Sequence, residues 1–509
     1  MSSGNATLAR SLLQSRCRIP RTASSRVFCR RRLTVLAIET SCDDTSVAIV
    51  KVADNEHDTR DATLPRPPRR LDALEVIFHE KETANSESFA GIHPLVALHS
   101  HRSNLALLVQ KATARLVTVS KQVTSSQYRT RDSPNLVAVT RGPGMRSNLS
   151  VGLDTAKGLA VAWNCQFIGV HHMQAHALTP RLVSAMANGD GESDRITSGA
   201  PQPNFPFLTV LASGGHTMLV DSTGLTEHAI LAETQDIALG NFLDQAARAI
   251  LPPELLLPPY GRALAKFAFH THIRTEVHDH DDELELDRGD KSVQCSQSND
   301  PAYHYTAPAR RQEELERRTT KWGWSLGPPL AESKGGQSSR RMIYSFAGLL
   351  SSVERFLKFK TASDGSHTAE PRLPADVSLA ERQDMAREVQ RVAFEHLASR
   401  IMLHLESVGQ RWTGDTIVVS GGVASNQFLR HVLRSMLDAR GYSHIQLSCP
   451  PVGLCTDNAL MIAWAGIEMY RAGYTSSLAI GPIRKWSMDP SNPDGGLLGV
   501  DGWMKREME

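Results

Sequence analysis

The sequence predicts an α/β fold made of two related lobes, and two observations support this prediction. A unit consisting of a strand, a short polar turn and a second strand occurs twice, at 33–50 and at 207–220. Helical patterns occupy much of the remaining sequence, so strands alternate with helices, as in α/β proteins. Because the strand–turn–strand unit recurs, we expect two related lobes that face each other.

The individual elements follow from local patterns. In the first unit, the apolar runs 35–38 and 47–50 flank a small polar segment. In the second unit, residues 213–216 (SGGH) form the turn. A third segment, 416–433 (TIVVSGGVASNQFLRHVL), reads as a strand, a glycine turn and a helix. Further helices are predicted within SNLALLVQKATARLV and MAREVQRVAFEHLASRIMLHL.

Two parts of the chain are expected to lie outside the folded core. Residues 1–37 contain eight Arg, many Ser and Thr, and no Asp or Glu. This composition favours a mitochondrial transit peptide, assigned to 1–32, over a basic tail that binds RNA. The segment at about 271–341 is highly charged and poor in aliphatic residues, so we expect a disordered or loosely docked insertion.

The composition excludes several classes of protein. The net charge of +2 does not indicate a generally basic nucleic-acid binder. The seven cysteines are scattered and contain no CxxC pair, which argues against a disulfide scaffold and a cysteine-based zinc site. No run of about 18 or more apolar residues occurs, so we expect a soluble protein without membrane association.

Glycine-rich turns are the first candidates for a binding site. Ser213, Gly214 and Gly215 form a turn in which backbone N–H groups can approach an anion, because glycine has no Cβ. The segment 420–426 (SGGVASN) leads into a helix, whose N-terminus also attracts anions. Together with 140–160, these turns favour a phosphate-bearing ligand over plain turns.

Acidic residues near these turns have two interpretations each. Asp43 and Asp44 lie between two strands, where they could face a ligand phosphate or its cation, or simply form the turn. Asp244 lies in a predicted helix and could bind a ribose hydroxyl or only decorate the helix surface. The residues alone leave both questions open.

The pair His172 and His176 is spaced to share one face of a helix, as metal ligands often are. A zinc protease of the HExxH class needs Glu directly after the first histidine, and Met173 stands there, so this class is excluded. A metal site with Asp457, which opens a later helix, is one interpretation. Unpaired histidines and a capping Asp are the other.

Six motifs occur in the order found in one known family: VLAIETSCDDTS, RGPGMRSNLSVGLDTAKGLA, HHMQAHAL, FLTVLASGGHT, VVSGGVASNQFLR and LCTDNALMIAWAG. The sequence resembles the tRNA N6-adenosine threonylcarbamoyltransferases from 33 to about 485, apart from the insertions. The ETSCDDTS motif is similar to the bacterial and mitochondrial branch. With the leader, it indicates a mitochondrial member.

The resemblance implies an actin-like ATPase fold with two lobes around a nucleotide cleft. We expect an N-terminal lobe at 33–171, completed by about 457–490, and a C-terminal lobe at 172–456. The implied reaction transfers the threonylcarbamoyl group of threonylcarbamoyl-AMP to N6 of the adenosine 3′ of the anticodon in mitochondrial tRNAs. The implied location is the mitochondrial matrix.

The resemblance also implies roles for individual residues. The metal ligands are His172, His176 and Asp457, holding one Zn or Fe(II) ion per subunit. Asp43 is an acid needed for activity, either as the acceptor of the amine proton or to position the cation. The adenylate substrate is held by Leu211, Ala212, Ser213, Gly214, Gly215, Asp244, Gly261 and Asn426. The implied partners are tRNA, a separate synthase that supplies the adenylate, and a second copy of the chain.

Two alternatives remain within the same broad fold. A sugar-kinase-like or chaperone-like protein that hydrolyses ATP would need an acid aimed at the γ-phosphate and would not need the histidine pair. A non-catalytic partner of a tRNA-modifying complex is the other. Such paralogues generally lose the metal ligands, which this chain keeps.

Overall fold

The computed structural model describes residues 32–53, 74–86, 89, 91–123, 133–187, 201–269, 303–331, 336–362 and 365–506. The predicted transit peptide lies outside the described residues, apart from Arg32. None of the described helices combines the length and the apolar character that a membrane crossing requires.

The first sheet has the strand order β3-β2-β1-β4-β5. Its strands are β1 (Arg32–Glu39), β2 (Asp44–Ala53), β3 (Leu74–Thr83), β4 (Leu136–Gly142) and β5 (Gln166–His171). Strands β1, β2 and β3 pair antiparallel, whereas β4 lies parallel to both β1 and β5. The predicted strand–turn–strand unit at 33–50 is therefore confirmed as the antiparallel pair of β1 and β2.

The second sheet has the strand order β13-β12-β6-β7-β8-β9. Its strands are β6 (Phe207–Ala212), β7 (Thr217–Ser222), β8 (His228–Thr234), β9 (Ile343–Tyr344), β12 (Thr416–Ser420) and β13 (Gln446–Ser448). Strands β6, β7 and β8 pair antiparallel, and β12 lies parallel to both β6 and β13. The order β8-β7-β6-β12-β13 thus repeats the order of the first sheet, with the same strand directions. This repetition confirms the prediction of two related lobes.

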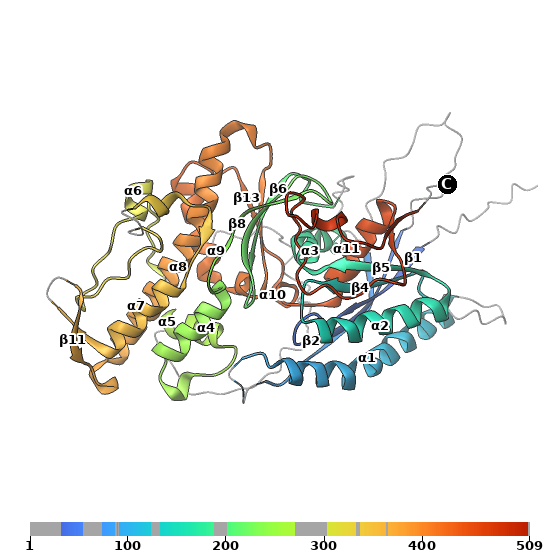
Figure 1. The fold of residues 1–509 in the computed structure, drawn as a ribbon, viewed down its shortest axis with the longest axis horizontal. Coiled ribbons are helices and arrows are strands. Elements are labelled where there is room, and N and C mark those ends of the chain that lie inside the picture. Colours follow the sequence, from blue (N-terminus) through green and yellow to red (C-terminus); the bar gives the residue numbers. More distant parts are fainter. Residues whose placement is uncertain are drawn as a thin grey trace, which may run out of the picture.

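Helices cover both faces of the first sheet. Successive residues of β1 point to opposite faces, and both sets are apolar. Leu36 and Ile38 pack with residues of α1 (Pro94–Val123) and α2 (Arg146–Trp163). Val35 and Ala37 pack with α3 (His172–Ala187) and α11 (Ala459–Arg471). Figure 1 shows α1 and α2 along one face and α3 and α11 on the other. Helix α11 therefore packs on a sheet whose strands lie far earlier in the chain.

Helix α3 lies at the junction of the lobes. It packs against α11 and the first sheet, and it also contacts β6 and β12 of the second sheet. The chain after α11 contacts both lobes. Strand β14 (Tyr474–Ser476) lies beside β5 of the first sheet and pairs with β15 (Trp503–Lys505). Trp486 and Met488 of the intervening segment pack on Leu211 of the second sheet.

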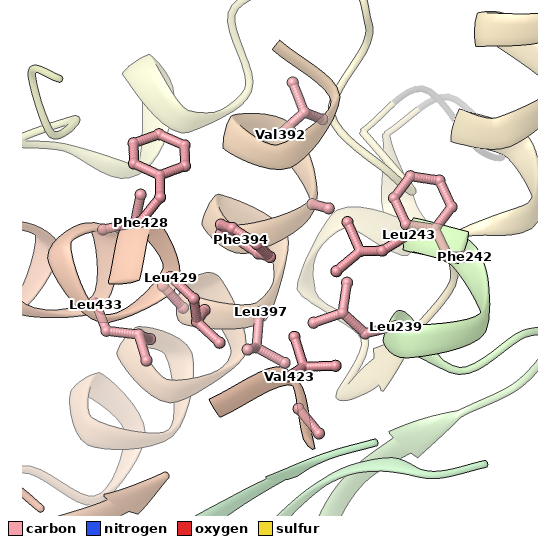
Figure 2. Close-up of a cluster of buried hydrophobic side chains, with 14 of the residues drawn as sticks. Leu239, Phe242, Leu243, Val392, Phe394, Leu397, Val423, Phe428, Leu429 and Leu433 are labelled. Carbon is pink, nitrogen blue, oxygen red and sulfur yellow. The ribbon is translucent and has the colours of Figure 1, made fainter. Parts of the chain in front are cut away.

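The second lobe has a large core on the other face of its sheet. It is built by α4 (Leu239–Ile250), α5 (Tyr260–Phe269), α7 (Ala347–Lys358), α8 (Leu379–Val408) and α9 (Gln427–Ala439). Figure 2 shows Leu239 and Phe242 of α4, Phe394 and Leu397 of α8, and Leu429 of α9 in this core. The helix predicted within 385–405 is confirmed as part of α8. Two short elements complete the lobe: the hairpin of β10 (Phe359–Thr361) and β11 (His367–Pro371), and α10 (Val452–Cys455).

The expectation of a loosely docked insertion is wrong for residues 303–331. This segment contains the short helix α6 (Arg311–Glu314) and Trp324, which is completely buried and donates a hydrogen bond to Glu381 Oε1 at 2.9 Å. Glu314 is also buried and pairs with Arg311 and with Arg440 of the second lobe. Aromatic packing and buried ion pairs thus replace the missing aliphatic residues. Residues 270–302 lie outside the described residues.

Candidate metal centre and adjoining glycine turn

The two predicted histidine ligands sit where the first sheet meets α3. His172 follows β5 directly and begins α3, and His176 lies one helical turn later on the same face. Both histidines are buried. Asp457 precedes α11, whose first turn is capped by Asn458 through a bond from Met461 N. Since α3 and α11 pack together, Asp457 reaches the two histidines.

The three side chains converge closely. His176 Nε2 lies 3.1 Å from Asp457 Oδ1, and His172 Nε2 lies 3.5 Å from the same oxygen. One donor atom from each residue lies within 4.8 Å of the other two. Donors bound to one zinc or iron ion at about 2 Å are themselves roughly 3–4 Å apart, so this arrangement fits a divalent metal ion. Two imidazoles and a carboxylate leave coordination positions for other ligands.

The electrostatics of the cluster also fit a cation. Burial alone would lower the pKa of His172, but the charges of Asp457 and Glu39 outweigh it and raise this pKa to about 9. Burial would raise the pKa of Asp457, but His172 and His176 hold it well below its usual range. In the metal-free protein a proton on His172 therefore supplies the positive charge that Asp457 requires. A metal ion would replace that proton.

Glu39 is a functional candidate that the sequence predictions missed. It ends β1, is fully buried, and places Oε2 3.3 Å from His172 Nδ1. Ser41 N and the Thr140 hydroxyl both donate hydrogen bonds to the Glu39 carboxylate. A carboxylate on Nδ1 fixes the ring so that Nε2 faces the metal. The available signal was the charged residue at the end of an otherwise apolar strand, because Glu is rarely fully buried without a partner.

The predicted glycine turn lies at the end of β6. Leu211 and Ala212 are buried strand residues, whereas Gly214 and Gly215 are exposed. The turn is closed by a hydrogen bond from Ser213 N to His216 O at 2.8 Å. Gly240, near the start of α4, donates from its N to Ser213 O at 3.0 Å and so holds the turn in place.

The glycine turn lies in the electrostatic field of the metal ligands. The surrounding protein atoms, and then the positive charge of His172, lower the pKa of His216 to about 4, although the residue is partly open to solvent at the surface of the turn. Met173, next to His172, packs with Leu211 at the base of the turn. The two predicted sites, which are separate in sequence, are therefore neighbours in the fold.

The other predicted adenylate residues form two further pairs of contacts. Asp244 of α4 accepts a hydrogen bond from Gly261 N at 2.9 Å, so these two residues are brought together. Asn426 caps α9 by accepting from Leu429 N at 3.2 Å, and it donates to Gln390 Oε1 at 3.0 Å. The structure thus shows a structural cap at Asn426, at the end of the predicted glycine segment.

The segment 420–426 adjoins the Ser213–Gly215 side of the sheet. Gly421 has φ +92°, and a Cβ there would lie 2.4 Å from Ala212 O, so only glycine permits this approach. Because β6 and β12 are parallel neighbours, both glycine segments lie at the same carboxyl edge of the sheet. Ligands of open α/β sheets bind at this edge.

Asp43 ends the turn between β1 and β2, and Asp44 is the first residue of β2. Asp44 accepts from Lys81 Nζ at 3.0 Å and from the Thr83 hydroxyl. Lys81 also donates to Thr456 Oγ1 at 2.9 Å, next to Asp457. Burial, with the nearby charge of Asp457, raises the pKa of Asp43 and raises that of Asp44 to about 6. Asp43 therefore has the raised proton affinity that an acid–base group needs, while Asp44 is occupied by Lys81.

Comparisons with known proteins identify the family of this chain. The family model described as tRNA N6-adenosine threonylcarbamoyltransferase matches residues 75–278 and 305–464. The mitochondrial tRNA N6-adenosine threonylcarbamoyltransferase of Schizosaccharomyces pombe is 32% identical, over 94% of this chain and 90% of its own length. The protein of that name from Danio rerio is 29% identical, over 86% of this chain and 83% of its own length. The one from Homo sapiens is 28% identical, over 92% of this chain and 86% of its own length.

Among solved structures the similarities are more distant. T. kodakarensis HypF shares 11% identity at a TM-score of 0.38, covering 88% of this chain and 50% of that protein. YeaZ from Pseudomonas aeruginosa shares 14% identity at a TM-score of 0.19, covering 38% of this chain and 60% of that protein. Similarities of this size do not define the fold, whereas the family match spans most of the chain. The chain belongs to the tRNA N6-adenosine threonylcarbamoyltransferase family.

Proposed function

We propose that this protein transfers the threonylcarbamoyl group of threonylcarbamoyl-AMP to N6 of the adenosine 3′ of the anticodon in mitochondrial tRNAs. The observation that carries the proposal is the meeting of His172, His176 and Asp457 next to β6, which leads into the glycine turn at 213–215. A kinase-like or chaperone-like ATPase has no need of such a histidine pair. The names of the family and of its relatives support tRNA as the substrate and the mitochondrion as the location.

The metal ligands in this proposal are His172, His176 and Asp457, holding one Zn or Fe(II) ion per subunit. When bound, such an ion supplies positive charge that polarises a substrate oxygen and offsets the charge of the phosphate. The chain's own contribution is to fix the His172 ring through Glu39 at Nδ1, so that Nε2 faces Asp457 and the metal position.

The reaction is an acyl transfer from a mixed anhydride. N6 of adenosine attacks the carbamoyl carbon, a C–N bond forms, and the C–O bond to the phosphate breaks, so that AMP leaves with the electron pair. The amine must also lose a proton, for which we propose Asp43 as the acceptor, since burial raises its pKa. In this proposal the backbone N–H groups of Gly214 and Gly215 bind the phosphate.

The adenylate is proposed to lie along the carboxyl edge of the second sheet. Its binding residues are Leu211, Ala212, Ser213, Gly214, Gly215, Asp244, Gly261 and Asn426. We further propose a cleaved leader at 1–32 and a location in the mitochondrial matrix. The proposed N-terminal lobe is 33–171, completed by about 457–490, and the proposed C-terminal lobe is 172–456. The proposed partners are a second copy of the chain and a separate synthase that supplies the adenylate.

The test incubates residues 33–509 with unmodified tRNA, threonylcarbamoyl-AMP and metal, followed by mass spectrometry of the digested nucleosides. We expect threonylcarbamoyladenosine from the parent and little from Asp457→Ala. The matched control is Asp154→Ala, which removes an exposed carboxylate from α2. Equal product from parent and Asp457→Ala would remove the metal from the proposal. No product from the parent, together with phosphate release from ATP, would support the ATPase instead.

A further inference from the structure

Three exposed cations gather beside the metal centre: Arg146 at the start of α2, and Arg484 and Lys485 near the C-terminus. Their two chain segments are packed backbone to backbone. Gly144 N donates to Arg484 O at 3.3 Å, and Ile483 N donates to Arg141 O at 2.9 Å. A Cβ on Gly142 would lie only 2.1 Å from Ile483 O, so this contact leaves no room for a side chain.

The cations border the metal centre from both segments. Met145, which precedes Arg146, donates from its N to Ser41 O at 2.9 Å, and Ser41 Oγ lies 3.3 Å from His172 Nδ1. On the other segment, Trp486 follows Lys485, and its carbonyl oxygen lies 3.0 Å from His171 Nε2. The segment of Arg146 therefore reaches the metal ligand His172 through Ser41. The segment of Lys485 reaches His171, the residue before that ligand, through Trp486.

Among the described residues, none of the three cations is held by a carboxylate, although the charge of Asp501 acts on the neighbouring Arg141. In the part of the chain that the structure describes, Arg146, Arg484 and Lys485 form no ion pair with a carboxylate. The first turn of α2 contains no acidic residue, and the N-terminus of this 18-residue helix adds partial positive charge. The buried Arg141, in the contact between the two segments, donates from Nε to Gly481 O at 3.2 Å.

We propose that Arg146, Arg484 and Lys485 form a phosphate-binding surface for the tRNA backbone next to the target adenosine. The inference rests on the proposed function, which makes tRNA the polyanion that must approach this centre. Exposed cations without carboxylate partners are available to RNA phosphates and release counterions when they bind. Guanidinium groups also match the geometry of phosphate oxygens. Such contacts set the position of the RNA and carry no base specificity.

The test compares the parent with the triple variant Arg146→Gln, Arg484→Gln, Lys485→Gln. A matched control, Arg340→Gln, Arg355→Gln, Arg411→Gln, removes three exposed cations from the second lobe and changes the net charge equally. The affinity for unmodified tRNA is measured by fluorescence anisotropy at several salt concentrations. We expect the first variant to raise the tRNA Kd roughly tenfold or more and to lower the slope of log K against log salt by about 2–3.

Three further readouts separate this surface from other roles. The KM for threonylcarbamoyl-AMP, the metal content and the thermal unfolding midpoint should all match those of the parent. An equal loss of tRNA affinity in the control would overturn the proposal, because net charge alone would then be responsible. A raised KM for the adenylate with unchanged tRNA affinity would also overturn it. A parent that binds tRNA but forms no product would contradict the proposed function. The difference in salt slope between the parent and the triple variant would still show whether the three cations bind RNA phosphates.

Discussion

Glu39 Oε2 lies 3.3 Å from His172 Nδ1, and this contact joins the end of β1 to the first residue of α3. Glu39 is fully buried, so its carboxylate is available only to groups inside the protein. We expect Glu39→Gln to weaken metal binding about 10–100-fold, because the neutral amide no longer favours the orientation and basicity of the ligand ring. The measurement is the metal dissociation constant, by competition with a chromogenic chelator.

The matched control for this prediction is Glu80→Gln. Glu80 pairs with Lys111 on the exposed side of β3, and its loss should leave metal affinity unchanged. Parent-like metal affinity in Glu39→Gln would show that the contact with His172 is structurally incidental.

Metal affinity should increase with pH up to about 9. The pKa of His172 is raised to about 9 by Asp457 and Glu39 against the effect of burial, so in the metal-free protein a proton occupies the ring at neutral pH. A metal ion must displace this proton, and below about pH 9 the affinity should therefore rise up to about tenfold per pH unit. Chelator competition at several pH values, from the ordinary histidine pKa of 6.5 up to about 9, measures this slope.

The stability of the metal-free protein should change in the opposite direction. Since the folded pKa of His172 lies above its unfolded value, the stabilisation by the charged ring is complete below pH 6.5 and is lost as pH rises through about 9. A metal affinity that does not vary between pH 6.5 and about 9 would contradict the first of these two pH predictions, because His172 would then already be neutral in the metal-free protein.

Gly240→Ala should weaken binding of the adenylate. A Cβ at this position would lie 2.7 Å from Ser213 O and 2.8 Å from Gly214 N, which are backbone atoms of the glycine turn. The turn must therefore shift, and a displacement of about 1 Å in a positioned site can cost up to roughly 100-fold in rate. The measurement is the KM and kcat with threonylcarbamoyl-AMP. Gly158→Ala in α2, where a Cβ meets no atom within 4 Å, should leave both constants unchanged.

Trp324→Ala should destabilise the second lobe by about 3–5 kcal/mol, the usual cost of truncating a large buried aromatic side chain. Trp324 is completely shielded from water, lies against Phe356 and donates a hydrogen bond to Glu381. Urea unfolding monitored by circular dichroism measures the change. Trp322→Ala, at a half-buried neighbour, should cost less. Equal and small losses for both variants would show that 303–331 is not docked in solution.

The amino-acid sequence by itself determined the features that depend on local order. The apolar runs on either side of Ser213–Gly215 predicted β6 and β7, and the four-residue spacing of His172 and His176 predicted their common helix face. These patterns are readable because side-chain periodicity reports the geometry of a strand or helix directly. The six motifs also indicated the family correctly.

Only the tertiary structure decided which distant residues meet. Asp457 reaches His176 across 281 positions because α11 packs on α3, and Glu39 reaches His172 because β1 and β5 lie in one sheet. Gly240 supports the glycine turn for the same reason, and Trp324 is buried within a segment whose composition predicted a disordered or loosely docked insertion. A sequence pattern contains residue chemistry and local period, whereas these contacts depend on the path that brings separate elements together.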